Sequence, residues 1–189
     1  MKVGLYFGSF NPIHNGHLII ANHVLQNTGM DAVWFIVSPQ NPFKQNHTLL
    51  NEYHRLHLVQ TAIEGETRMR AVDIEFKLPR PSYTIDTLTY LEEKYPEYEF
   101  SLIMGSDSLE NIEKWKSGEV ILKRYTICVY ERLNYPTRHI EGAKIISIKA
   151  PLIEISASLI RSNIKSGKSI RYLVPDSVMN EIERSGYYK

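Results

Sequence analysis

Two histidines and two glycines lie close together near the start of the chain, directly after a short apolar run. Residues 8–17 read Gly-Ser-Phe-Asn-Pro-Ile-His-Asn-Gly-His, and residues 3–7 before them form the apolar run. An apolar run that ends in glycine is typical of a buried strand entering a tight turn, and residues 17–26 have the amphipathic pattern of a helix. The start of such a helix offers unpaired N–H groups and a positive dipole end, with His14 and His17 on one side. The segment therefore predicts a phosphate-binding site.

Two other interpretations of this segment stay open from the residue types. His14 and His17 have a spacing that suits zinc, but four-coordinate zinc needs further ligands, and Cys128 lies far away in an apolar run. The histidines could also serve only to cap the helix. The combination of glycine, Asn-Pro and His-Asn-Gly-His at one strand-to-helix junction favours the phosphate site over both.

The segment resembles the G-x-F-x-P-x-H-x-G-H signature of the nucleotidyltransferase superfamily, which is related to the class I aminoacyl-tRNA synthetases. Four further segments carry the resemblance: residues 41–44 (Asn-Pro-Phe-Lys), 81–87 (Pro-Ser-Tyr-Thr-Ile-Asp-Thr), 105–107 (Gly-Ser-Asp) and 155–161 (Ile-Ser-Ala-Ser-Leu-Ile-Arg). Together they are similar to the bacterial nicotinate mononucleotide adenylyltransferases, a family of NAD biosynthesis. The similarity runs through nearly the whole chain.

The composition fits such an enzyme without proving it. With 189 residues, 43% of them hydrophobic and 23% charged, the chain can bury one sizeable core, so we expect residues 1–189 to form a single domain. A net charge of +1 gives no general basic field and no support for a nucleic-acid partner. One cysteine, no long apolar segment and no signal-peptide pattern predict a cytoplasmic protein without a membrane partner. A homo-oligomer is left open.

Apolar runs rich in β-formers alternate with helical patterns along the chain. We expect strands at residues 3–7, 32–37, 69–76, 100–104, 126–130 and 144–148, and helices at 17–28, 52–64, 84–94, 157–166 and 175–185. This alternation predicts an α/β Rossmann-like nucleotidyltransferase fold, with a mostly parallel sheet, helices on both faces and a C-terminal helical part over about 155–189. Ligands of such sheets bind beyond the carboxyl ends of the strands, where Gly8, residues 38–44 and residues 105–107 are expected to meet.

The reaction implied by the resemblance is attack of the nicotinate mononucleotide phosphate on the α-phosphorus of ATP. A phosphate monoester has a second pKa of about 6, so at neutral pH it is mostly dianionic and needs no general base. Catalysis then consists of aligning two polyanions and stabilising the charge that develops. Mg²⁺ is expected with ATP as the cofactor. Since the chain shows no carboxylate cage, we expect substrate phosphates and water, rather than protein ligands, to hold the ion.

The resemblance also implies site residues. The expected catalytic residues are His14, His17, Lys44 and Arg161. The expected ATP-binding residues are Gly8, Ser9, Phe10, His14, Gly16, His17, Gly105, Asp107, Ser156, Ser158 and Arg161. Bound triphosphate should favour the charged forms of both histidines, because a nearby opposite charge stabilises imidazolium. Taken from the local pattern alone, Ser156 is a helix N-cap and Arg161 could equally be a surface arginine.

For nicotinate mononucleotide, the expected binding residues are Ser9, Lys44, Tyr83, Thr84 and Trp115. Thr84 opens a helical pattern whose free N–H groups suit a pyridine carboxylate, and Trp115 can stack on the pyridine ring. The alternative for Trp115 is a core anchor, and an isolated lysine such as Lys44 would ordinarily be a solvated surface charge. Trp34 is expected in the core, and His54 and His57 on a helix surface.

Three positions depart from the family pattern. Phe7 replaces a commonly paired glycine, Phe43 replaces a histidine that commonly precedes the lysine, and Ala157 replaces a hydroxyl residue. Phe43 removes a hydrogen-bond donor from the segment at residues 39–44. Two other functions stay open: a pantetheine-phosphate adenylyltransferase, although those chains are typically shorter and lack the segment at 83–86, and a regulator that keeps the fold without the chemistry.

Overall fold

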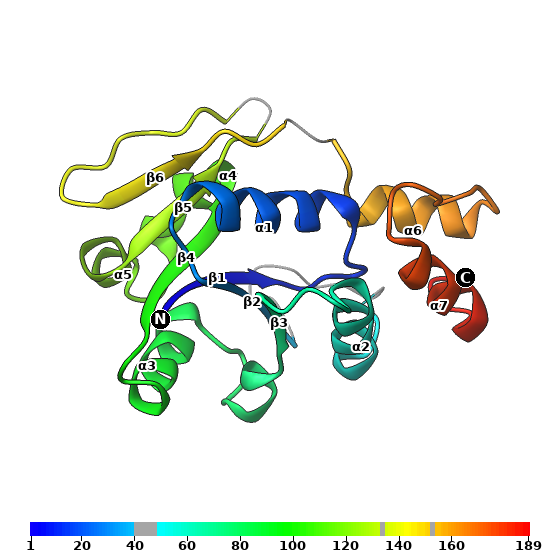
Figure 1. The fold of residues 1–189 in the computed structure, drawn as a ribbon, viewed down its shortest axis with the longest axis horizontal. Coiled ribbons are helices and arrows are strands. Elements are labelled where there is room, and N and C mark those ends of the chain that lie inside the picture. Colours follow the sequence, from blue (N-terminus) through cyan, green and yellow to red (C-terminus); the bar gives the residue numbers. More distant parts are fainter. Residues whose placement is uncertain (40–48, 133–134, 152–153) are drawn as a thin grey trace.

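The computed structural model describes residues 1–39, 49–132, 135–151 and 154–189, and in these residues it contains one six-stranded parallel sheet (Figure 1). The strands follow the order β3-β2-β1-β4-β5-β6 across the sheet. Their bounds are β1 Lys2–Gly8, β2 Ala32–Val37, β3 Met69–Val72, β4 Glu99–Gly105, β5 Thr126–Tyr130 and β6 Lys144–Ile148. The strand order reverses between β1 and β4, and ligands of open parallel sheets bind at such a reversal, beyond the carboxyl ends of the strands.

Helices cover both faces of the sheet, as predicted. The helices are α1 Asn15–Asn27, α2 Glu52–Ala62, α3 Thr84–Lys94, α4 Ser106–Glu110, α5 Gly118–Arg124, α6 Ala157–Lys165 and α7 Asp176–Ser185, with single 3₁₀ turns η1 Ile74–Lys77 and η2 Ile112–Lys114. Side chains of α1, α2, α6 and α7 join one apolar cluster, and those of α3, α4 and α5 join the other. The predicted α/β class, with helices on both faces, is therefore confirmed. Within the described ranges, no helix is long and apolar enough to cross a membrane.

The strand β2 shows why continuous apolar runs become central strands here. All its residues are buried, because successive side chains point to opposite faces of the sheet and both faces are covered. Phe35 packs into the cluster shared with α1, and Trp34 into the cluster shared with α3. Trp34 is 4% exposed, so its expected place in the core is confirmed.

The C-terminal helices pack beside the start of α1. In Figure 1, α6 and α7 lie together at the orange-to-red end of the chain, and α7 contacts α2. Ile160 of α6 and Ile182 of α7 belong to the same apolar cluster as α1. The backbone N–H of Asn15 donates to the carbonyl of Leu173 at 2.9 Å. These contacts bring the last helices to the histidine motif.

Two expectations differ from the structure. The strand predicted over residues 69–76 ends at Val72, and the chain then turns into η1. Ile74 and Phe76 continue the alternating pattern, but the carboxylate of Glu75 between them is buried and accepts from the hydroxyls of Ser82 and Thr87 at 2.9 and 3.0 Å. The helices α4 and α5 were missed, because elements of 5 and 7 residues are too short for a clear helical period.

Candidate active site

The turn between β1 and α1 is built around a close approach of Gly8 to Phe10. A Cβ added to Gly8 would lie 2.9 Å from the ring of Phe10, so a larger residue does not fit without a shift. Phe10 is buried and has a φ of +44°, a left-handed conformation that is uncommon for an aromatic residue. The backbone thus turns sharply at the end of β1 and enters α1 with His14 as its N-cap residue.

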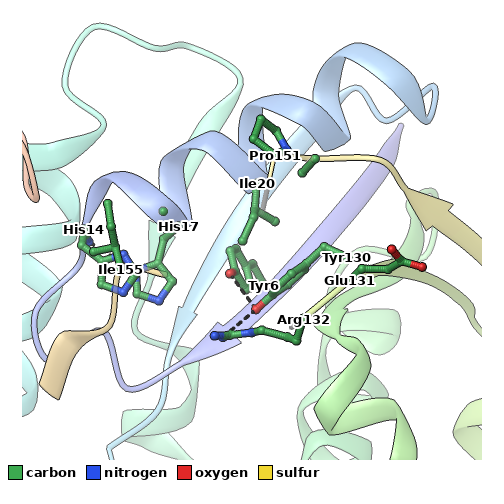
Figure 2. Close-up of a pocket in the computed structure, with 11 residues that line it drawn as sticks. Tyr6, His14, His17, Ile20, Tyr130, Glu131, Arg132, Pro151 and Ile155 are labelled. Atoms are coloured by element: carbon green, nitrogen blue, oxygen red, sulfur yellow. Dashed lines mark hydrogen bonds between the residues drawn. The ribbon is translucent and has the colours of Figure 1, made fainter. Parts of the chain in front are cut away.

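His14 and His17 stack on each other at the start of α1. Their ring centroids are 3.7 Å apart with an interplanar angle of 25°, and Figure 2 shows the two rings side by side. The backbone N–H of His14 donates to Nδ1 of His17 at 3.3 Å. Because Nδ1 is an acceptor in this bond, the neutral imidazole of His17 carries its proton on Nε2. His17 therefore offers an N–H donor in a fixed orientation.

Burial favours the neutral form of both histidines. Loss of solvation lowers the pKa of His14 to about 4, and the positive charge of Arg132 contributes to this shift. Burial also holds the pKa of His17 well below its usual range, with His14 and Arg132 as smaller causes. A bound polyphosphate would oppose these effects, because its negative charge favours imidazolium.

Arg132 is a site residue that sequence reasoning missed. In Figure 2 it lines the same pocket as His14 and His17 and lies beside Tyr130. Its Nη2 donates to the hydroxyl of Tyr130 at 3.3 Å, and its Nε lies 3.7 Å from Oδ1 of Asp107. Arg132 follows the end of β5, and Gly8 is the last residue of β1, so the rule that ligands bind beyond strand ends could have found Arg132.

The helix α6 brings Arg161 onto the β1–α1 turn. Ser156 accepts from the N–H of Leu159 at 3.2 Å, which confirms it as the N-cap of α6. Arg161 donates from Nη2 to Oγ of Ser158 at 3.2 Å and from Nη1 to the carbonyl of Asn11 at 2.7 Å. Arg161 is therefore not simply a surface arginine, because it contacts the histidine motif across 150 residues of sequence.

Most of the residues expected to bind ATP line one cavity of about 570 Å³. They are Gly8, Ser9, Phe10, His14, His17, Asp107, Ser156, Ser158 and Arg161. Gly16 lines a smaller adjoining cavity together with both histidines, and Gly105 lies at the end of β4 beside Asp107. The structure thus gathers segments from the start, middle and end of the chain at the carboxyl edge of the sheet.

Of the residues expected to bind nicotinate mononucleotide, Ser9 lines this cavity and Trp115 lines a space that shares Tyr6 and Tyr130 with it. Trp115 is partly buried against the core and lines a space of about 70 Å³ that it shares with Gly105. Thr84 is the first residue of α3 and Tyr83 its N-cap residue. Lys116 connects the two segments, since its Nζ lies 4.8 Å from the ring centroid of Tyr83. Ser9 lines the larger cavity, and Lys44 and Phe43 lie outside the described residues.

The other candidate groups lie elsewhere. His54 and His57 are exposed on α2, as expected. In the part of the chain that the structure describes, no group of three or more His, Cys, Asp or Glu side chains could hold a metal ion.

The first turn of the sheet, the paired histidines and Arg161 surround one crevice, and comparison with known proteins shows the family to which such a chain belongs. Residues 5–163 match the cytidylyltransferase-like family model. A Flavobacterium psychrophilum protein named "Probable nicotinate-nucleotide adenylyltransferase" is 53% identical over 100% of both chains. A Cytophaga hutchinsonii protein of the same name is 50% identical over 100% of this chain and 98% of its own. The chain therefore belongs to the nicotinate-nucleotide adenylyltransferase family.

A solved structure of similar fold supports the architecture. The Plasmodium falciparum nicotinic acid mononucleotide adenylyltransferase complexed with NaAD superimposes with a TM-score of 0.81 at 20% sequence identity. The match covers 99% of this chain and 97% of that one. The C-terminal helices are therefore part of the shared fold.

Proposed function

We propose that this chain transfers the adenylyl group of ATP to nicotinate mononucleotide, forming nicotinate adenine dinucleotide and pyrophosphate. The observation that carries the proposal is the meeting of His14, His17 and Arg161 at one cavity of about 570 Å³. Full-length relatives at 50% and 53% identity carry the name of this activity.

The nucleophile needs little activation. The phosphate of nicotinate mononucleotide is mostly dianionic at pH 7, since the second pKa of a phosphate monoester is about 6. One of its oxygens attacks the α-phosphorus of ATP, and the bond from that phosphorus to the bridging oxygen breaks as pyrophosphate takes the electron pair. The protein must then align the two substrates and stabilise the oxygens that gain charge.

The charge balance of the cavity suits this task. Arg132 and Arg161 line it together with both histidines, and Asp107 is the one carboxylate among its described lining residues. The Nε2–H of His17 and the imidazole of His14 donate to phosphate oxygens in a desolvated site, where such bonds are strongest. Arg161, held on the carbonyl of Asn11, approaches the same oxygens.

The remaining roles follow from the β1–α1 turn and the end of β4. The backbone N–H groups of Ser9 and Phe10 face the triphosphate, and Gly16 allows close approach of the chain. A Cβ on Gly105 would lie 2.3 Å from Oδ1 of Asp107, so glycine leaves room for that carboxylate, which we assign to the adenosine side. We assign Lys44 to the phosphates as well.

Mg²⁺ is proposed to enter with ATP. Asp107 already pairs with Arg132 at 3.7 Å, so the donor set suits an ion held by phosphates and water rather than by the protein. Such an ion neutralises charge on the triphosphate and on the leaving pyrophosphate.

The acceptor site is assigned to the start of α3 and to Trp115. The free N–H groups beside Tyr83 and Thr84, with the positive end of the helix dipole, favour the carboxylate of nicotinate over the neutral amide of nicotinamide. We also propose that residues 1–189 form one catalytic domain, because α6 shares the core cluster of α1. A cytoplasmic location stays a prediction.

The test is pyrophosphate release from ATP with a panel of acceptors. We expect kcat/KM for nicotinate mononucleotide to exceed that for nicotinamide mononucleotide by at least ~10², since charge-assisted hydrogen bonds contribute about 1.5–3 kcal/mol each. Trp115→Ala should lower both values alike, because both pyridine rings present a similar face for stacking. Equal kcat/KM values for the two acceptors would show that the proposed carboxylate pocket does not exist. Turnover with pantetheine phosphate and with no other acceptor would overturn the proposed function.

A further inference from the structure

Arg55 of α2 is fully buried and is surrounded by backbone carbonyls. Its Nε donates to the carbonyl of Leu50 at 2.8 Å, its Nη1 to Ser38 at 2.8 Å and its Nη2 to Pro39 at 3.0 Å. Nη1 also donates to the carbonyl of Ser9. One guanidinium thus joins the end of β2, the entry to α2 and the β1–α1 turn.

This arrangement is unusual for a buried charge. Buried arginines ordinarily pair with a carboxylate, because isolated charges are costly to remove from water. The acidic residue nearest to Arg55 in sequence, Glu52, is instead bonded to Arg80 at 2.6 Å. Burial lowers the pKa of Arg55 to about 10, so its positive charge is retained at pH 7. A positive charge therefore lies beneath the turn that we assign to the phosphates, held by four backbone carbonyls, with a favourable electrostatic contribution from Glu52.

The bond to Ser9 fixes the orientation of one peptide group. In a trans peptide the carbonyl of one residue and the N–H of the next point in opposite directions. Because the carbonyl of Ser9 points to Arg55, the N–H of Phe10 points away from Arg55, and both Ser9 and Phe10 line the cavity. The φ of Phe10, +44°, sets this orientation, and a residue with a side chain would ordinarily relax to negative φ.

We propose that Arg55 is a positioning residue for adenylyl transfer, which holds the Ser9–Phe10 peptide so that the N–H of Phe10 faces the bound phosphates. Its buried charge also adds positive potential at the same place. This inference rests on the proposed function. A planar fork with five donors can hold all four carbonyls at once, whereas a lysine ammonium has three donors at one point.

The first test follows the parent protein with NMR while inorganic tripolyphosphate is added. We expect the amide resonance of Phe10 to shift downfield as its N–H bonds to phosphate, and the Nε–H of Arg55 to stay protected from solvent exchange. An unchanged Phe10 amide at saturating tripolyphosphate overturns the proposal. This readout needs no acceptor and no variant, so it remains decisive if Arg55 variants do not fold. Failure of the parent to use nicotinate mononucleotide would count only against the proposed function.

The second test compares Arg55→Lys with the parent at equal amounts of folded protein, measured by near-ultraviolet circular dichroism. We expect kcat to fall by ~10–10² and tripolyphosphate binding to weaken by about tenfold, because one preorganised donor is lost. Millimolar guanidinium should partly restore kcat in Arg55→Ala. Arg68→Gln is the control, since Arg68 is exposed and pairs with Glu66. If Arg55 had only a structural role, the variant would have a lower Tm, but the kcat and the tripolyphosphate affinity of its folded fraction would stay within about twofold of the parent. That result overturns the proposal.

Discussion

Replacing His17 tests both its role and its tautomer. The structure places Nδ1 of His17 on the backbone N–H of His14, at 3.3 Å, which leaves Nε2–H as the donor that we propose for the substrate. The ring is held by stacking on His14 and by an edge contact with Phe10, whose centroid is 5.1 Å away. His17→Ala removes a donor that is already desolvated and oriented before the substrate arrives.

The expected magnitude follows from this preorganisation. Loss of one such donor costs ~2.7–4 kcal/mol in the transition state, so kcat should fall by ~10²–10³ while ATP affinity changes less. A glutamine amide nitrogen reaches about as far as Nε2, whereas an asparagine nitrogen reaches only the position of Nδ1. We therefore expect His17→Gln to exceed His17→Asn in kcat by at least about tenfold.

The assay is pyrophosphate release at saturating ATP and acceptor, with thermal melts to confirm that each variant is folded. His57→Ala is the matched control, because His57 is 52% exposed on α2. A kcat of His17→Ala within about threefold of the parent would show that His17 does not stabilise the transition state. A higher kcat for His17→Asn than for His17→Gln would show that His17 does not donate from Nε2.

Two further predictions concern pH and the segment outside the described residues. The folded-state pKa of His14 is about 4 against an ordinary 6.5, so the unfolded chain binds more protons between these values and the free energy of unfolding should fall as pH drops from 6.5 to 4. The free energy of unfolding should fall by about 3 kcal/mol over this range. If the unfolding free energy of His14→Asn varied with pH as steeply as that of the parent, the prediction would be contradicted. Lys44→Ala should weaken nucleotide binding by ~10–10² in calorimetry, whereas Phe43→His should tighten it or leave it unchanged. Equal binding by Lys44→Ala and the parent would exclude Lys44 from the site.

The elements that sequence predicted best are those whose burial is continuous. The runs at residues 32–37 and 126–130 became strands with the predicted bounds, because a strand between two covered faces is largely apolar. The strand at 144–148 also has the predicted bounds, although only Ile148 in it is buried. The helix at 84–94 was also predicted with its observed bounds. The strand over 69–76 was overextended, since the alternating pattern does not reveal that Glu75 finds hydroxyl partners and ends the strand.

The candidate site could be predicted where residue types and their spacing are distinctive. It could not be predicted where side chains bind backbone carbonyls. The histidine motif has a recognisable order of residues, and it does line the main cavity. Arg55 sits inside an ordinary helical pattern, and its acceptors are carbonyls of three separate segments, which leave no trace in side-chain identity. Arg132 follows a strand end, but a single charged residue there resembles a solvated loop residue.

The bond between Arg161 and the carbonyl of Asn11 makes the synthesis of α6 a condition for assembly of the phosphate site that we propose. During synthesis the histidine motif leaves the ribosome first, and the arginine that completes the cavity is added 150 residues later. A nascent or truncated chain that stops before α6 holds both histidines but lacks this cation. We therefore expect such fragments to bind ATP more weakly than molecules in which α6 has formed.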